Sequence, residues 1–113
     1  DIYFTGGMTD SGHTNEVVRV SWSSLEVTQK AAMKSPRREH GSVYDGDYLY
    51  VIGGSDGYCM SECERLLVRK DRWEALKPLP SKCYGVSVVV LKDTQCLYAL
   101  GGWLGHGGSR DII

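Results

Sequence analysis

A double glycine that ends a short apolar segment occurs three times, and it constrains the fold of this chain more than any other feature. The copies are residues 2–7, 49–54 and 97–102, and each has an aliphatic residue, a tyrosine, two further residues and then Gly-Gly. They begin 47 and then 48 residues apart. A fixed period of this size is typical of repeat proteins, in which each unit packs against its neighbours.

The bulk composition excludes several classes of partner. The chain has 113 residues, of which 42% are hydrophobic and 24% charged, and its net charge is -1. This is an ordinary composition for a globular domain, and it gives no broad attraction to nucleic acid or to anionic membranes. No stretch approaches the roughly 18 consecutive apolar residues of a membrane span. We therefore expect no nucleic-acid partner and no membrane partner, and we expect the chain to be part of a longer protein.

The four cysteines do not predict a metal site. Cys59, Cys63, Cys83 and Cys96 lack the short paired spacings of zinc ligands. Reduced thiols in a cytoplasmic protein are the preferred interpretation, and two disulfides in a secreted protein are the alternative. We expect no cofactor and no metal.

Strand signals fill the chain, and no segment predicts a helix. After a first strand that ends at the first glycine pair, strands are expected at residues 15–22, 25–29, 39–44, 48–52, 62–68, 73–76, 84–91 and 96–100. Residues 8–14 are polar and are expected to form a loop, and Asp45-Gly46 predicts a tight hairpin turn. The strands before the glycine pairs are apolar at nearly every position, so both of their faces must be covered. Four-stranded antiparallel sheets covered on both faces are the blades of a β-propeller.

The second repeat resembles a kelch repeat. Its glycine pair is followed by Asp56-Gly57, then by Glu64-Arg65, and then by Trp73 before a proline-containing connector. The resemblance covers almost the whole chain, as pieces of three consecutive repeats. There are departures: Leu66 stands where the family has tyrosine, and the first repeat reads Val-Arg-Val at residues 18–20.

The resemblance implies an all-β fold of kelch-type β-propeller blades, in an incomplete ring of about two and a half blades. Residues 1–33 would form a partial repeat, 34–80 a complete one, and 81–113 a partial repeat of two strands with a glycine-rich tail. The glycine pairs would allow a close backbone approach where each strand leaves its sheet. Tyrosines and a tryptophan would pack between blades. These structural residues are Gly6, Gly7, Gly53, Gly54, Gly101, Gly102, Tyr3, Tyr50, Tyr98 and Trp73.

The resemblance also implies a protein–protein interaction module and not an enzyme. In kelch-like adaptors a partner peptide touches residues just after each glycine pair and residues at the start of each innermost strand. Carried onto this sequence, the candidate partner-binding residues are Met8, Ser55 and Trp103, then Glu39 and Cys83, with Tyr58 as a further loop aromatic. Trp103 is the favoured anchor, because an exposed tryptophan offers a large contact area with little entropy to lose. Packing of each residue against a neighbouring loop is the alternative.

The resemblance is closest to kelch-like proteins that often carry a BTB domain and recruit substrates to cullin-RING ubiquitin ligases. The expected partner is then a peptide or degron of a substrate protein. An actin-binding kelch protein is one alternative, and a kelch-fold enzyme of the copper oxidase or sugar isomerase type is another. For the enzyme, the candidate residues are His13, His40 and His106, and the adjacent pairs Tyr58-Cys59 and Cys83-Tyr84.

Overall fold

A computed structural model describes residues 1–94 and 96–104, and the regular secondary structure of this part of the chain is almost entirely β-strand. The strands are β1 (Ile2–Thr5), β2 (Met8–Thr9), β3 (Gly12–His13), β4 (Val17–Val20), β5 (Val27–Lys30), β6 (Gly41–Tyr44), β7 (Tyr48–Ile52), β8 (Cys63–Leu67), β9 (Arg72–Ala75), β10 (Ser87–Leu91) and β11 (Cys96–Leu100). One short 3₁₀ turn, η1 (Val68–Lys70), joins β8 to β9. The prediction of an all-β fold is confirmed.

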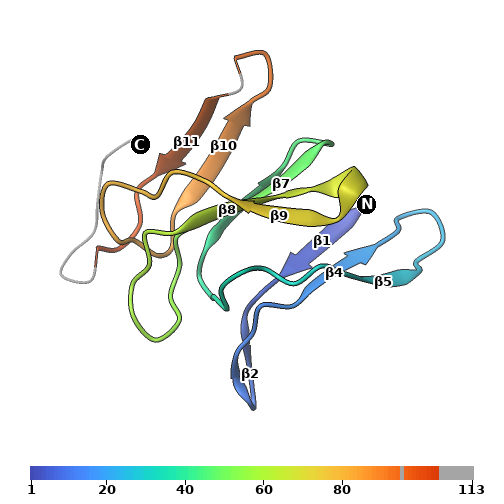
Figure 1. Ribbon diagram of the computed structural model, residues 1–113, viewed down its shortest axis with the longest axis horizontal. Helices are drawn as coiled ribbons and strands as arrows, with labels where there is room; N and C mark the ends of the chain where they lie inside the picture. Colours follow the sequence, from blue (N-terminus) through green and yellow to red (C-terminus); the bar gives the residue numbers. More distant parts are fainter. Residues whose placement is uncertain (95, 105–113) are drawn as a thin grey trace.

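Three antiparallel sheets stand side by side (Figure 1). We call them blade 1 (β1-β4-β5), blade 2 (β6-β7-β8-β9) and blade 3 (β10-β11). Each strand pairs with the next main strand along the chain, as in an up-and-down sheet. β6 lies against β10, so these two strands mark the inner side of the arrangement. The predicted repeat divisions at residues 33/34 and 80/81 lie in the connectors between the blades.

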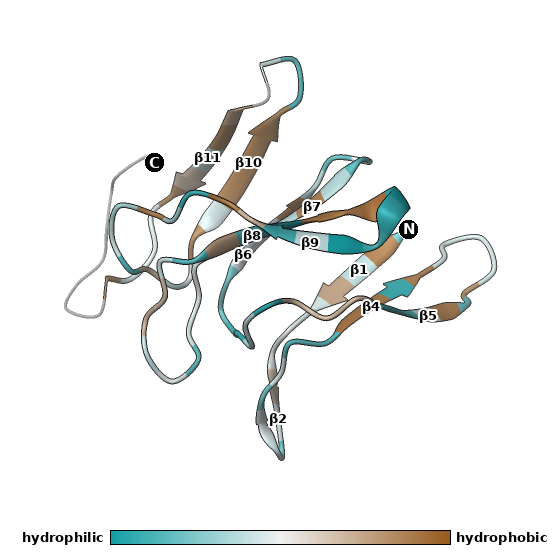
Figure 2. Cartoon of the chain, in the orientation of Figure 1, coloured by the Kyte–Doolittle hydropathy of each residue, from teal (hydrophilic) through white to brown (hydrophobic). Residues whose placement is uncertain are grey.

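β7 shows why the glycine-ended strands are apolar throughout. Side chains alternate across a strand, so its two faces meet two different blades. Leu49 and Val51 pack in the core between blades 1 and 2, whereas Tyr50 and Ile52 pack in the core between blades 2 and 3. Figure 2 shows the hydrophobic colour along β7, β10 and β11 and the hydrophilic colour at η1. Burial on both faces explains the continuous apolar pattern.

Three of the four predicted aromatic residues, Tyr3, Tyr50 and Trp73, pack between the blades, and Tyr98 does not. Trp73 is buried between blades 1 and 2, and its Nε1 donates a hydrogen bond to the Ala31 carbonyl at 2.7 Å. Tyr3 packs against the same core, and Tyr50 belongs to the next one. Tyr98 is 38% exposed, because alternation along β11 directs Ala99 toward blade 2 and Tyr98 toward the opposite side.

The glycine pairs form the joints between blades. Gly7 N–H donates to the Arg37 carbonyl at 2.8 Å, and Gly54 N–H donates to the Cys83 carbonyl at 2.9 Å. Each carbonyl belongs to the connector that enters the next blade. The first glycine of the first two pairs leaves room for the same carbonyl: a Cβ added at Gly53 would lie 2.5 Å from the Cys83 oxygen, and Gly6 is in the same position beside the Arg37 oxygen. The close approach and the positive φ of 60° at Gly53 both require glycine.

A buried ion pair ties the first connector to blade 2. The Arg37 guanidinium is fully buried and lies 2.9 Å from Glu64 Oε2. It also donates to the carbonyls of Gly53 and Glu62 at 2.7 and 2.9 Å. Cys83 holds the equivalent position in blade 3, where its Sγ donates to the Gly101 carbonyl at 3.5 Å. The first glycine carbonyl of the pair therefore accepts a hydrogen bond from a guanidinium in blade 2 and from a thiol in blade 3.

Two further features bear on the expectations. Residues 8–14 contain the short hairpin β2–β3, with Met8 opposite His13 and Thr9 opposite Gly12, so the expectation of an irregular loop is wrong there. Residues 105–113, which include most of the predicted glycine-rich tail, lie outside the described residues. Within residues 1–94 and 96–104, no helix has the length and hydrophobicity needed to cross a bilayer.

Candidate partner-binding site

The inner hairpins of blades 2 and 3 continue beyond the glycine pairs as matching backbone bridges. Arg38 and Ser55 exchange two hydrogen bonds of 2.9 Å, and Tyr84 and Trp103 exchange bonds of 3.0 and 2.7 Å. The positions are equivalent, because Ser55 and Trp103 each follow a glycine pair directly. These bridges hold four side chains at the glycine end of the sheets, where the loops extend from the body of the molecule (Figure 1).

An open cleft of about 450 Å³ lies between these bridges. Its lining residues come from both blades and are Arg38, Glu39, Ser55, Gly57, Tyr58, Cys59, Tyr84 and Trp103. Tyr58 is 83% exposed and Trp103 45% exposed, whereas Ser55 is buried. Three aromatic rings and two oppositely charged side chains thus surround a recess with a polar floor.

The loop that carries Tyr58 is held by its own hydrogen bonds. Gly57 N–H donates to Ser55 Oγ at 3.2 Å, and Tyr58 N–H donates to Asp56 Oδ1 at 3.2 Å. Met60 N–H donates to the Gly54 carbonyl at 2.9 Å and closes the loop. A ring presented on a loop of this kind loses little backbone freedom when it contacts a partner.

Glu39 and Arg38 are the charged groups of the cleft. Glu39 is exposed and has a φ of +53°, in the left-handed region that disfavours residues with a side chain. Its carbonyl accepts a hydrogen bond of 2.6 Å from Gly85 N–H, which places it beside Tyr84. No ion pair formed within residues 1–94 and 96–104 includes either side chain. Both charges are therefore available to a partner.

His40 lies at the joint between blades 1 and 2, beside Gly6 and Gly54. Its Nε2 shares a hydrogen bond of 2.7 Å with Thr5 Oγ1. Burial, with a further contribution from the Arg37 guanidinium, lowers the pKa of His40 from 6.5 to about 4. The ring is therefore neutral at physiological pH, as suits a side chain packed between blades.

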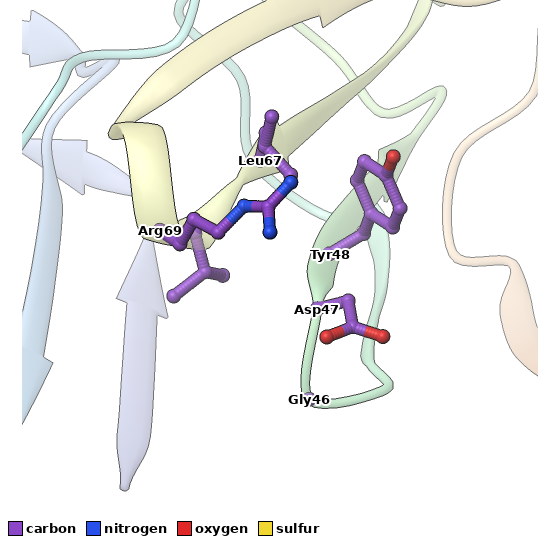
Figure 3. A pocket seen from close by; sticks show the side chains of 6 residues that line it. Gly46, Asp47, Tyr48, Leu67 and Arg69 are labelled. Atoms are coloured by element: carbon purple, nitrogen blue, oxygen red, sulfur yellow. The ribbon is translucent and has the colours of Figure 1, made fainter.

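Two other recesses differ in character from the cleft. A recess of about 290 Å³ lies at the turn end of blade 2. Figure 3 shows Arg69 extending toward Tyr48 above Asp47 at this recess. An apolar recess of about 360 Å³ lies between blades 2 and 3, beneath the connector that contains Leu79. None of the candidate partner-binding residues lines either one.

Comparison with known proteins gives the family. Residues 36–80 match the Kelch motif. The chain is 31% identical over 105 residues to Kelch-like protein 41a of Danio rerio, which covers 90% of the chain and 17% of that protein. The chain belongs to the kelch-repeat family.

Other kelch relatives agree. Kelch-like protein 7 of Mus musculus is 28% identical over 87 residues, which cover 76% of the chain and 14% of that protein. Beta-scruin of Limulus polyphemus is 38% identical over 82 residues, which cover 71% of the chain and 9% of that protein. The chain thus spans less than a fifth of the length of each of these relatives. The sheets are kelch-type β-propeller blades, and the relatives support a protein-interaction module.

The structure brings four of the six candidate partner-binding residues together, since Glu39, Ser55, Tyr58 and Trp103 all line the cleft. Met8 is 55% exposed in the β2–β3 hairpin of the first repeat and does not line it. Cys83 is fully buried. From that position its side chain cannot touch a partner, and the residue equivalent to Glu39 in blade 3 is Gly85.

Four cleft residues are absent from the predicted partner-binding set, namely Arg38, Gly57, Cys59 and Tyr84. Arg38 and Tyr84 each form the backbone bridge with the residue that follows the glycine pair, so the pairing register identifies both. A count along the sequence could have found them only with the hairpin lengths known.

The histidines considered for an enzyme are dispersed, whereas Tyr58, Cys59 and Tyr84 of the two adjacent pairs line the cleft. His13 lies in β3 and His40 in the connector to β6, and His106 lies outside the described residues. Burial raises the pKa of the Cys83 thiol, so it stays protonated. Within the described part of the chain, no group of three or more His, Cys, Asp or Glu side chains could hold a metal ion.

Proposed function

We propose that this kelch module binds a peptide segment of a partner protein in the cleft at the glycine end of blades 2 and 3. The observation that carries the proposal is the cleft itself. It gathers exposed and half-buried aromatic and charged side chains from four separate segments, around residues 38–39, 55–59, 84 and 103. Loops set on a rigid scaffold are the usual place for binding residues.

The chemistry of the cleft suits a peptide. Tyr58 and Trp103 offer large faces, and aromatic residues of this kind dominate the energetics of protein interfaces. Arg38 and Glu39 can pair with charged side chains, and Ser55 at the floor keeps the recess polar. The hydrogen-bonded loop around Tyr58 reduces the entropy lost on binding.

For the whole protein, we propose the substrate-recognition part of a BTB-kelch-like ubiquitin-ligase adaptor in the cytoplasm, with a degron as the bound peptide. The similarity to Kelch-like proteins 7 and 41a supports this role. The four cysteines are free thiols, which is compatible with a reducing compartment. Co-purification of a cullin with the full-length protein tests the adaptor role. Co-sedimentation with filamentous actin instead would favour the cytoskeletal alternative.

The test of the cleft is affinity capture with the full-length protein and two tryptophan variants. Trp103→Ala removes a cleft residue, and Trp22→Ala is the matched control because Trp22 is 73% exposed on blade 1 and outside the cleft. Truncation of an aromatic anchor typically costs about 2 kcal/mol or more, so we expect capture of the partner to fall at least tenfold with Trp103→Ala. Equal capture by both variants would refute the assignment of the cleft.

A further inference from the structure

We infer that the cleft selects a peptide with one basic side chain, whose cationic group lies against the Glu39 carboxylate and the aromatic rings of Tyr58, Tyr84 and Trp103. This inference rests on the proposed function, because it names the chemistry of the peptide bound at the same site. It is carried by three observations: the order of residues along the cleft, the conformation of Glu39, and the balance of charge.

The first observation is that the cleft residues form a continuous row. Ser55 is paired with Arg38 through the backbone, and Glu39 follows directly. The Glu39 carbonyl is bonded to Gly85 N–H at 2.6 Å, and Tyr84 is paired with Trp103. The carboxylate-bearing residue thus lies between the Tyr58 loop on one side and the Tyr84–Trp103 bridge on the other.

The second observation is the left-handed backbone of Glu39. Gly85, at the equivalent position of blade 3, has a φ of +70°, so the repeat places a glycine conformation at this point. A residue with a side chain is disfavoured there, and Glu39 forms no ion pair within the described residues that would offset the strain. The Glu39 backbone carbonyl bonds Gly85 N–H, but a glycine at position 39 would keep that bond without strain, so the strain favours a binding role for the Glu39 side chain.

The third observation is the balance of charge. A cation is attracted both to a carboxylate and to the faces of aromatic rings, so Glu39 among three rings favours a lysine or arginine. The other nearby carboxylate, Asp56, already accepts a hydrogen bond from its own loop. The Arg38 guanidinium lines the same cleft and repels a second cation. The site therefore suits a single basic residue beside apolar or acidic neighbours, and not a polybasic tract.

The test begins with selection of phage-displayed random heptapeptides on the full-length protein. We expect enrichment of peptides with one lysine or arginine next to an apolar residue. A selected peptide, made synthetically, is then titrated against the wild-type protein and its variants. Glu39→Gln keeps the size of the side chain and removes its charge. We expect this variant to bind the peptide about tenfold more weakly, with an affinity that depends less on salt concentration. Glu26→Gln, at an exposed position of the blade 1 turn, is the matched control and should change neither quantity.

A second variant separates binding from folding. Glu39→Gly adopts the backbone conformation without strain, so the melting temperature should rise or stay the same while the peptide affinity falls as it does for Glu39→Gln. Joint loss of thermal stability and affinity would assign Glu39 a structural role and overturn the inference.

The possible outcomes distinguish this inference from the proposed function. Selected peptides that require Trp103 but carry no basic residue would leave the proposed function standing and overturn the inference. Enrichment of acidic peptides would also overturn the inference and leave the proposed function standing, and it would indicate that Arg38 selects the peptide. An unchanged affinity with Glu39→Gln would also overturn it. Peptides that bind equally well to the Trp103→Ala variant would refute the proposed function itself.

Discussion

Replacement of Gly53 by alanine is the sharpest test of the joint between blades 2 and 3. The added methyl group would lie 2.5 Å from the Cys83 carbonyl oxygen and 3.2 Å from Leu79 Cδ1. Ordinary contact begins at about 3.4 Å. The connector into blade 3 therefore has to move by about 1 Å, because protein interiors are close-packed and leave no alternative space.

The magnitude follows from the bonds that this movement disrupts. The displaced connector carries two backbone hydrogen bonds, from Gly54 N–H to the Cys83 carbonyl at 2.9 Å and from Cys83 N–H to the Met60 carbonyl at 3.0 Å. Each contributes about 1 kcal/mol. The left-handed backbone of Gly53 adds about 1 kcal/mol for any residue with a side chain. We expect a total loss of about 3 kcal/mol in the free energy of unfolding.

Gly85→Ala is the matched control. Gly85 also has a left-handed φ, of +70°, but no atom lies within 4 Å of its added Cβ. The expected loss in the free energy of unfolding is about 1 kcal/mol. Alanine also lowers the entropy of the unfolded chain relative to glycine, but this effect is the same in both variants and cancels in the comparison. Urea unfolding of the full-length protein, followed by the fluorescence of the interblade Trp73, measures the difference. Equal losses for the two variants would refute the role of the first glycine as a joint.

The remaining predictions concern the two polar groups buried near the joints. The unfolded chain binds a proton at His40 below pH 6.5, but the folded protein does so only near pH 4. Stability should therefore fall by about 3 kcal/mol as the pH drops from 6.5 to 4, and His40→Val should remove this loss in unfolding curves measured across that range. Arg37→Met leaves the Glu64 carboxylate buried without its partner and should cost about 3–5 kcal/mol. Adding Glu64→Val should recover part of that cost in a double-mutant cycle, and simple additivity of the two losses would contradict the account.

The sequence predicts the repeat and most strands because turns separate them sharply. The range predicted for β7 coincides with the observed strand, since Asp45-Gly46 precedes it and Gly53-Gly54 follows it. The β2–β3 hairpin escapes prediction because strands of two residues carry no alternating pattern. Local sequence therefore predicts a strand only where the strand is long enough for its hydrophobic pattern to be recognised.

The cleft is predicted in part, and the reason lies in the hairpin lengths. The β6–β7 ladder has four residue pairs and the β10–β11 ladder has five. A count back from the glycine pair therefore reaches different levels of the innermost strand in the two blades. Glu39 lies 14 residues before Gly53, whereas the equivalent Gly85 lies 16 residues before Gly101, so a fixed count does not identify it. Pairing registers depend on tertiary contacts, which a single sequence does not display.

The assignment of the cleft as the partner-binding surface is tested most directly by photo-crosslinking. A benzoyl-phenylalanine is placed at Tyr58 in one sample of the full-length protein and at Trp22 in another, since both side chains are exposed and only Tyr58 lines the cleft. The account predicts that the partner crosslinks to the protein from position 58 and not from position 22. Crosslinking from position 22 with none from position 58 would contradict it.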